Sequence, residues 1–270
     1  MQHTPLAVLV ASVFATGCAA SHGNDVAASR PHRAVLYQYS VIDGLLAGAY
    51  DGDLTMAGLK QHGDFGLGTF NALDGELLLI DGVSYQVRSD GSVRVAPDGL
   101  RSPLGFATFF APTQTFTLDA TATLADLQAE LARRLHPNAA YAIELRGRFA
   151  NLTARSEDPA TRPYAEMSAH MAAHEHRFPL TNFDGVAAGF WLPPYLGRVN
   201  VPGLHLHCLS SDRRAGGHLL EFQGAGPLMI RVMELDVVEL EISKHADFQA
   251  VDLAHDRRRS LEQVEHTAPR

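Results

Sequence analysis

Three histidines in the segment GLHLHCLSSDRRAGGHLLEF have the residue type and the spacing of a metal site on one β-hairpin. They are His205, His207 and His218. Side chains two positions apart on a strand share a face, so His205 and His207 point the same way. If the chain reverses around residues 212–213, His218 lies opposite His207 with the Cβ atoms roughly 5 Å apart. The three imidazoles would then be close enough to share a small cation.

Three imidazoles predict a particular kind of metal chemistry. Neutral imidazole is a good zinc ligand, and three protein ligands leave the fourth position open, as in catalytic zinc sites. The competing interpretation is chance, because the chain has 14 histidines and a lone His-x-His is more often incidental. Cys208 has the opposite strand parity to His207, so we expect a buried apolar residue there rather than a ligand.

Two charged residues elsewhere are candidates for acid–base or anion chemistry. Glu76 follows an Asp-Gly turn and precedes the apolar run Leu77 to Ile80. It is either an edge residue at the mouth of a sheet or an acid whose pKa is raised by burial. Arg155 comes just beyond a predicted strand and could grip a carboxylate in bidentate fashion, although alone it is also an ordinary surface arginine. The histidines at 170, 174 and 176 lack the glutamate of a zinc-protease helix, so we do not expect them to form a metal site.

The elements that must position these residues are mostly strands. The capping-box sequence at Thr123 and the leucine spacing predict a helix over 123–135. Asp-Gly turns predict an antiparallel meander over 66–110. Further predicted elements are short helical or irregular segments at 37–50 and 55–61, a strand at 141–152, a short helix at 164–174, and a second all-antiparallel region comprising 185–192, the histidine hairpin and 228–242.

This pattern predicts an α+β fold rather than a doubly wound α/β sheet. The N-terminal region would be a mostly antiparallel or mixed sheet. A second β-rich, barrel-like region would carry the histidine hairpin, with few inserted helices. The chain has 270 residues with 46% hydrophobic and 19% charged, an ordinary globular composition. A net charge of −8 provides no basic stripe for nucleic acid, so we expect a small-molecule partner.

Both ends of the chain differ from the predicted body. Leu6 to Ala15 is apolar but too short to span a bilayer, which favours an export signal over residues 1–20. Cys18 lies where a lipoprotein would be cleaved and lipid-anchored, and an ordinary small-residue cleavage site is the alternative. Residues 21–33 would be a flexible spacer. We therefore expect an exported protein, whether a periplasmic lipoprotein or a secreted one. The charged segment from His255 to Arg270 is most simply a solvated end.

Several ordered segments together resemble the α-acetolactate decarboxylase family. They are LYQYSVIDGLLAGAYDG at 36–52, HGDFGLGTFNALDGE at 62–76, the Arg155 region ending at Pro163-Tyr164, GFWLPPYL at 189–196 and the histidine hairpin. The resemblance covers roughly residues 36–222. Around the arginine this family commonly has Thr-Arg-Ser-Val-Pro, whereas residues 154–159 here are Ala-Arg-Ser-Glu-Asp-Pro. We therefore expect a loop of different shape beyond Arg155.

The resemblance implies a complete active site. It implies Zn²⁺ bound by the three hairpin histidines, with catalytic roles for Glu76, Arg155 and a glutamate of the C-terminal tail. Glu265 is the match in the tail, with Glu262 as the alternative. The implied catalytic domain spans 34–270, with an N-terminal sheet at about 34–137, a C-terminal β region at about 138–254 and an active-site tail at about 255–270. The resemblance also implies a homodimer.

The implied reaction is decarboxylation of (S)-2-acetolactate (2-hydroxy-2-methyl-3-oxobutanoate) to (R)-acetoin and carbon dioxide, in acetoin and butanediol biosynthesis. Two other functions stay open from the residues themselves. One is a metal-dependent hydrolase or cupin-like enzyme that uses the same hairpin. The other is an exported metal- or ligand-binding module without catalytic activity.

Overall fold

The computed structural model describes residues 33–265. The expected export signal at 1–20, Cys18 and all but the last residue of the spacer at 21–33 lie outside the described residues. Within the described range, no helix has both the length and the apolar character needed to cross a membrane.

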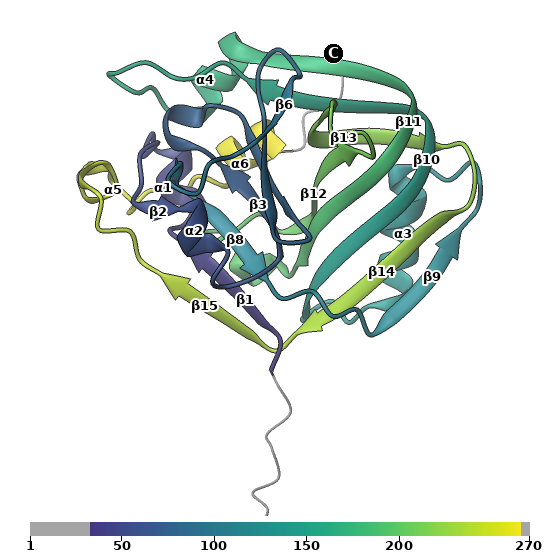
Figure 1. The fold of residues 1–270 in the computed structure, drawn as a ribbon. Coiled ribbons are helices and arrows are strands. Elements are labelled where there is room, and N and C mark those ends of the chain that lie inside the picture. The colour runs from purple at the N-terminus through teal and green to yellow at the C-terminus, as the bar shows by residue number, and fades with distance from the viewer. Residues whose placement is uncertain (1–32, 266–270) are drawn as a thin grey trace, which may run out of the picture. The chain divides into compact units, whose positions relative to one another are not determined.

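The first sheet has seven strands within the described residues and carries most of the N-terminal half (Figure 1). In order across the sheet they are β15 (Val237–Glu241), β1 (Val35–Tyr39), β8 (Gly105–Thr108), β3 (Phe65–Thr69), β4 (Glu76–Ile80), β5 (Val83–Val87) and β6 (Val93–Val95). Two further short strands, β2 (Leu54–Thr55) and β7 (Arg101–Ser102), pair with each other. The meander expected over 66–110 is present from β3 to β6, but β8 returns to pair with β3 and β1.

The second sheet has six strands in the described part of the chain. In order they are β11 (Glu175–Leu192), β12 (Gly203–Ser210), β13 (Gly216–Gly224), β10 (Ala140–Glu157), β14 (Leu228–Leu235) and β9 (Gln114–Leu118). β10 also pairs with β11 along almost its whole length. The pairings β11–β12, β12–β13, β13–β10 and β10–β11 therefore close a ring, which is the physical basis of the expected barrel-like region. The predicted α+β fold, rich in sheet with few helices, is confirmed.

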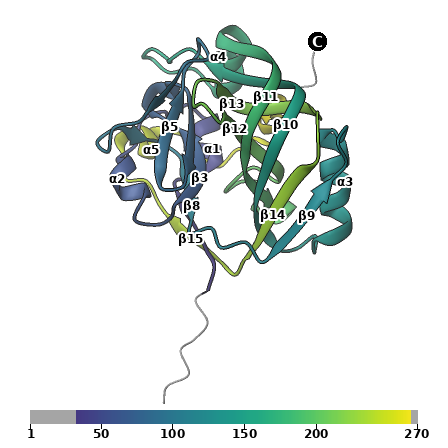
Figure 2. The same cartoon turned by 45° about the vertical axis from the view of Figure 1, so that its right-hand side comes forward.

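The two sheets are packed in layers with a helix on each outer side. One core cluster lies between the sheets and joins Leu78 and Ile80 of β4 to Phe190 of β11. A second cluster packs the outer face of the second sheet against α3 (Leu124–Arg134), which Figure 2 shows beyond β9 and β14. The third cluster packs the outer face of the first sheet against α2 (Met56–Leu59). The run Leu77 to Ile80 is apolar throughout because both faces of β4 are covered.

Six α-helices connect or cover these sheets in the described residues. They are α1 (Ile42–Leu46), α2, α3, α4 (Met167–His174), α5 (Ala246–Ala250) and α6 (Arg258–Glu265), with short 3₁₀ turns at Asn71–Leu73 and Pro194–Leu196. The capping box predicted at the start of α3 is present, because Thr123 and Asp126 each accept from the other's backbone N–H. The short helix expected at 164–174 is confirmed with a later start.

Several predicted elements are wrong in extent or placement. Residues 37–39, expected as helical or irregular, belong to strand β1. The strand expected at 141–152 extends to Glu157. The run 228–242 does not stay in one antiparallel region, because β14 joins the second sheet while β15 pairs with β1 in parallel. The expected boundary near residue 137 therefore does not separate the sheets, since β9 precedes it and β15 returns to the first sheet.

The C-terminal segment is also corrected by the structure. It is not simply solvated, because it forms α6, whose Leu261 and Val264 are buried in the core cluster between the sheets. Hydrophobic residues three apart place both side chains on one helical face. That face docks α6 beside α4.

Candidate active site

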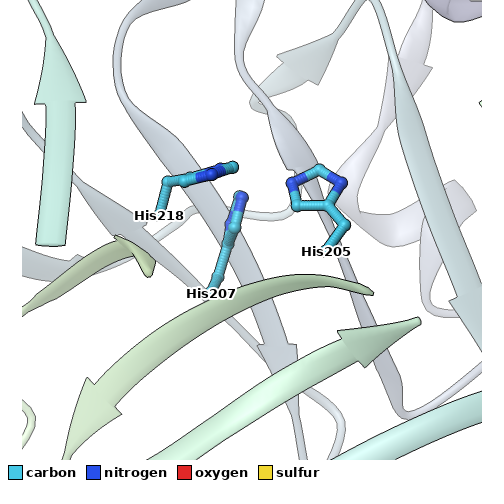
Figure 3. A group of neighbouring side chains, drawn as sticks. All are labelled: His205, His207 and His218. Atoms are coloured by element: carbon cyan, nitrogen blue, oxygen red, sulfur yellow. The ribbon is translucent and has the colours of Figure 1, made fainter. Parts of the chain in front are cut away.

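The histidine hairpin forms with the predicted register. Strands β12 and β13 reverse through a turn in which Arg213 has a positive φ, and His207 pairs directly with His218. Figure 3 shows the three imidazole rings turned toward one another. One ligand nitrogen from each of the three lies within 4.8 Å of the others. The spacing of the sequence therefore brings His205, His207 and His218 together as expected.

Glycine is required beside the third histidine. Gly217 has φ of 135°, and a Cβ there would stand 2.4 Å from the carbonyl oxygen of Arg155 on the neighbouring strand. A side chain would push β13 away from β10, so this position needs glycine. The Gly-Gly pair thus lies in the returning strand and allows His218 to lie opposite Arg155.

His207 is fixed in the tautomer that a metal ligand needs. Its Nδ1 lies 2.8 Å from the carbonyl oxygen of Leu77, and because a carbonyl only accepts, Nδ1 carries the hydrogen. The Nε2 lone pair is therefore directed toward the other rings, 3.3 Å from Glu76 Oε2. Burial, together with the neighbouring His205, lowers the pKa of His207 well below its usual value. The ring is neutral, the state that binds metal.

Glu76 is a buried acid and not an edge residue. It begins β4, which lies between β3 and β5, and it shares a strand face with Leu78 and Ile80. That face points at the second sheet, where the histidines are. Burial and then the charge of Glu157 raise the pKa of Glu76 well above its usual value, although Arg155 opposes them. Of the two alternatives from the sequence, the buried acid is the correct one.

Arg155 lies inside strand β10 and is only 2% exposed, so the prediction that it follows the strand is wrong. Its Nη1 donates to Glu175 Oε2 at 2.9 Å and to the carbonyl oxygen of Val264. Its Nη2 lies 3.9 Å from Glu265 Oε2. A guanidinium held by these groups is a fixed positive charge beside the histidines.

Glu265 reaches the histidines from the last residue of α6. Its Oε2 lies 3.8 Å from His205 Nε2 and 3.7 Å from His218 Nε2, and its side chain is 6% exposed. The alternative, Glu262, is exposed on the same helix. The structure therefore places Glu265, and not Glu262, with the other predicted site residues.

One cavity is lined by all six predicted site residues. Its remaining wall is largely apolar, with Ile42, Leu45, Leu104, Phe106 and Met167. Glu157 also lines this cavity and was not singled out by the sequence. The available signal was strand parity, since Glu157 is two residues beyond Arg155 and so shares its face. Exclusion of water by the apolar wall strengthens electrostatic interactions inside the cavity.

The other histidine cluster is arranged around an aspartate. His176 Nε2 lies 2.9 Å from Asp158 Oδ2, and His170 Nε2 lies 2.9 Å from the Asp158 carbonyl oxygen. His174 stacks on His170. Cys208 is fully buried in the apolar cluster beneath α3, which confirms the expectation of a core residue.

The donor set fits a divalent transition metal. Three imidazoles with converging nitrogens are the ligands that zinc accepts, and nearby carboxylates offset its charge. A small anionic substrate in this cavity would meet the charge of Arg155 and carboxyl groups able to move a proton. The arrangement can therefore support reactions in which negative charge develops on a substrate oxygen.

Comparison with known proteins gives a consistent result. The family model described as Alpha-acetolactate decarboxylase matches residues 36–255. A curated relative of that name from Methanosarcina mazei is 38% identical over 233 residues, covering 86% of this chain and 80% of its own. The relative from Brevibacillus brevis is 36% identical over 231 residues, covering 85% and 76%. The family match ends before α6, so Glu265 lies beyond it.

Solved structures agree with the sequence comparisons. The X-ray structure of alpha-acetolactate decarboxylase from Bacillus subtilis strain 168 matches with a TM-score of 0.83 and 33% identity, covering 86% of this chain and all of that chain. A Staphylococcus aureus protein of unknown function, described as similar to that enzyme, has a TM-score of 0.80. Its 23% identity supports the shared fold alone.

Proposed function

The chain belongs to the α-acetolactate decarboxylase family, a family of carboxy-lyases, and we propose that it uses zinc to convert (S)-2-acetolactate into (R)-acetoin and carbon dioxide. One observation carries this proposal. A single buried cavity holds three converging imidazoles, one arginine and several carboxyl groups. Those are the groups that a β-keto acid decarboxylase needs.

The atoms of the reaction define what these side chains must do. The bond between the carboxylate carbon and the carbinol carbon breaks, and its electron pair moves toward the ketone. Carbon dioxide leaves, and the carbinol carbon then takes one proton. The acetolactate anion and one proton thus give acetoin and carbon dioxide, so the site must supply a proton in every turnover.

The residues divide these tasks by position. Arg155 is fixed by Glu175 and the Val264 carbonyl, and its charge would orient the substrate carboxylate. His205, His207 and His218 would hold the zinc ion, which would act as a Lewis acid and lower the energy of negative charge that develops on a substrate oxygen. Glu76 and Glu265 flank the histidines, so either carboxyl group can deliver the proton to carbon. Solvent then restores it.

The test uses the full chain with racemic acetolactate. We expect about one zinc per chain and release of acetoin and carbon dioxide above the spontaneous rate, without an organic cofactor. Chelation should abolish the activity and added zinc should restore it. Replacing all three hairpin histidines with alanine should remove both zinc and activity. The matched control, His176→Ala, changes an exposed histidine outside the cavity and should leave both unchanged. Activity that survives the triple replacement would contradict the metal mechanism.

We also propose that the chain is exported and that Cys18 carries a lipid anchor. The apolar run at 6–15, followed by small residues at the cysteine, supports this proposal. Labelled palmitate should be incorporated into the wild-type chain and not into Cys18→Ala, with the wild type recovered in the membrane fraction. A soluble, unlabelled wild-type chain in the secreted fraction would favour ordinary cleavage. Light scattering on the mature chain tests the homodimer implied by the family.

A further inference from the structure

Two buried polar atoms of strand β10 lack a complementary hydrogen-bonding group in the part of the chain that the structure describes. Nε of Arg155 is a donor, and no acceptor of residues 33–265 reaches it. Oε2 of Glu157 is an acceptor, and no N–H or hydroxyl donor of the same residues reaches it. Both residues are 2% exposed. Because buried polar atoms are almost always paired, each of these two atoms requires a partner from a bound molecule.

The same two residues border the active-site cavity. They lie two positions apart on β10, so their side chains share a face of the strand. Both line the cavity that contains the three hairpin histidines. The Nη1 atom of Arg155 already donates to Glu175 and to the Val264 carbonyl oxygen, which fixes the guanidinium and leaves its Nε for a ligand.

An α-hydroxy acid carries the two groups that these atoms require. Its carboxylate accepts hydrogen bonds, and the hydroxyl group on the neighbouring carbon donates one. In acetolactate this hydroxyl is the single donor, because the ionised carboxylate and the ketone oxygen only accept. Arg155 suits the carboxylate, and Glu157 is the acid that shares a strand face with Arg155. The neighbouring groups of the substrate therefore match neighbouring groups of β10.

We propose that Glu157 is a substrate-binding residue that accepts a hydrogen bond from the substrate hydroxyl while Nε of Arg155 donates to the substrate carboxylate. This role rests on the proposed function, because it concerns binding of the 2-hydroxy-3-oxo acid. A carboxyl group keeps an acceptor oxygen in either protonation state, so the contact does not depend on the charge of Glu157. The pair would select α-hydroxy acids over acids of the same shape without the hydroxyl.

The test measures binding rather than turnover, with two stable acids of matched shape. One is 2-hydroxy-2-methylpropanoate, and the other is 2,2-dimethylpropanoate, in which a methyl group replaces the hydroxyl. Calorimetric titration of the zinc-loaded full chain gives a Kd for each acid. The ratio of the two Kd values measures the preference for the hydroxyl, and we expect the wild type to prefer the hydroxy acid.

Two substitutions of Glu157 separate the hydrogen bond from the charge. Glu157→Leu removes the acceptor, so the preference should fall by about tenfold. Glu157→Gln keeps a carbonyl acceptor, so the preference should stay within about twofold of the wild type. Both variants remove a negative charge, which alters the affinity for both anions alike and cancels in the ratio. If the leucine variant does not fold or bind zinc, Glu157→Met serves as the apolar replacement.

The matched control is the same pair of substitutions at Glu221, which is exposed on β13. Neither Glu221→Leu nor Glu221→Gln should change the preference for the hydroxy acid. An altered preference in both would show that the ratio reports on the general charge of the chain.

Three results would overturn this role of Glu157. They are an unchanged preference in the apolar variant, an equal loss of preference in the apolar and glutamine variants, and a wild type without binding or without preference. The fate of the proposed function is separate. A wild type that prefers the hydroxy acid but releases no acetoin from acetolactate would contradict the decarboxylase activity, whereas an active enzyme whose preference is independent of Glu157 would contradict this inference alone.

Discussion

Glu262 and Glu265 lie on the same short helix but in opposite environments. α6 buries Leu261 and Val264, so Glu265 follows the buried face while Glu262 points to solvent. A carboxyl group beside two imidazoles and an arginine has a functional environment, whereas an exposed one is a solvated charge. The tail sequence does not decide which of the two glutamates belongs to the site. Burial decides it, because the side chain of Glu265 is buried there and Glu262 is exposed.

We predict that Glu265→Gln lowers kcat by about 10²-fold or more, because the amide keeps the shape but removes both the acid–base group and the negative charge beside Arg155, His205 and His218. Glu262→Gln, the matched change three residues earlier, should stay within twofold of the wild type. Both variants should unfold at the wild-type temperature within a few degrees. Steady-state acetoin release and thermal unfolding measure these outcomes. Equal activity in the two variants would assign no catalytic role to either tail glutamate.

At the residue scale, the sequence predicts local pairs better than distant ones. His205, His207 and His218 follow from strand parity and one tight turn, so 14 residues of sequence contain the whole geometry. Strand parity places Glu157 on the same face as Arg155, but its place in one cavity with Glu76, about 80 residues earlier in the chain, depends on how the two sheets pack. Glu76 and Arg155 are candidates from the sequence, and the resemblance implies their catalytic roles, but only the fold shows that both are buried.

At the element scale, the short helix α6 contributes two of the groups that form the site. It provides Glu265 and the Val264 carbonyl that fixes Arg155, yet its anchoring consists mainly of two apolar side chains and its contact with α4. A short terminal helix with few buried contacts opens more easily than a central strand.

The charged composition of 255–270 predicts a frayed end because Leu261 and Val264 are too sparse a pattern to show a buried face. Likewise, β15 looks like the continuation of β14, since nothing local shows that Asp236 begins a crossing to the other sheet.

We predict that Leu261→Ala weakens α6 docking and lowers activity far more than it lowers global stability. Truncating a buried leucine to alanine costs about 2–5 kcal/mol of stability, and here we expect the cost to fall on the docking of one helix. Hydrogen exchange should speed up in α6 amides and stay slow in β10 and β11. Leu131→Ala on α3 is the control: an equally buried leucine whose loss should lower the unfolding temperature without changing kcat. Faster exchange throughout both sheets of Leu261→Ala would contradict a locally docked α6.

At the scale of the whole molecule, the active site is an interface between two sheets. The first sheet supplies Glu76, and the second supplies the histidines, Arg155 and Glu157. The distance between Glu76 and the site residues of the second sheet depends on the apolar cluster between the sheets. In that cluster Phe65 of β3 contacts Phe190 of β11 edge to face, with ring centroids 6.0 Å apart. The opposite face of the second sheet packs on α3 through a separate cluster that includes Phe149.

Phe65 and Phe149 allow a matched experiment on the interface between the sheets, since each is at most 2% exposed and neither lines the cavity. Replacing either with alanine should cost about 3–5 kcal/mol of unfolding free energy, because both leave a similar void. Only Phe65→Ala removes packing between the sheets, so only it should let Glu76 move relative to His207 and lower kcat and zinc affinity. Phe149→Ala should leave both near wild type at temperatures where it is folded. Denaturant unfolding, zinc titration and acetoin release measure the three quantities. Equal catalytic losses in the two variants would mean that the site responds to overall stability, whereas a loss confined to Phe65→Ala would tie catalysis to the spacing of the sheets.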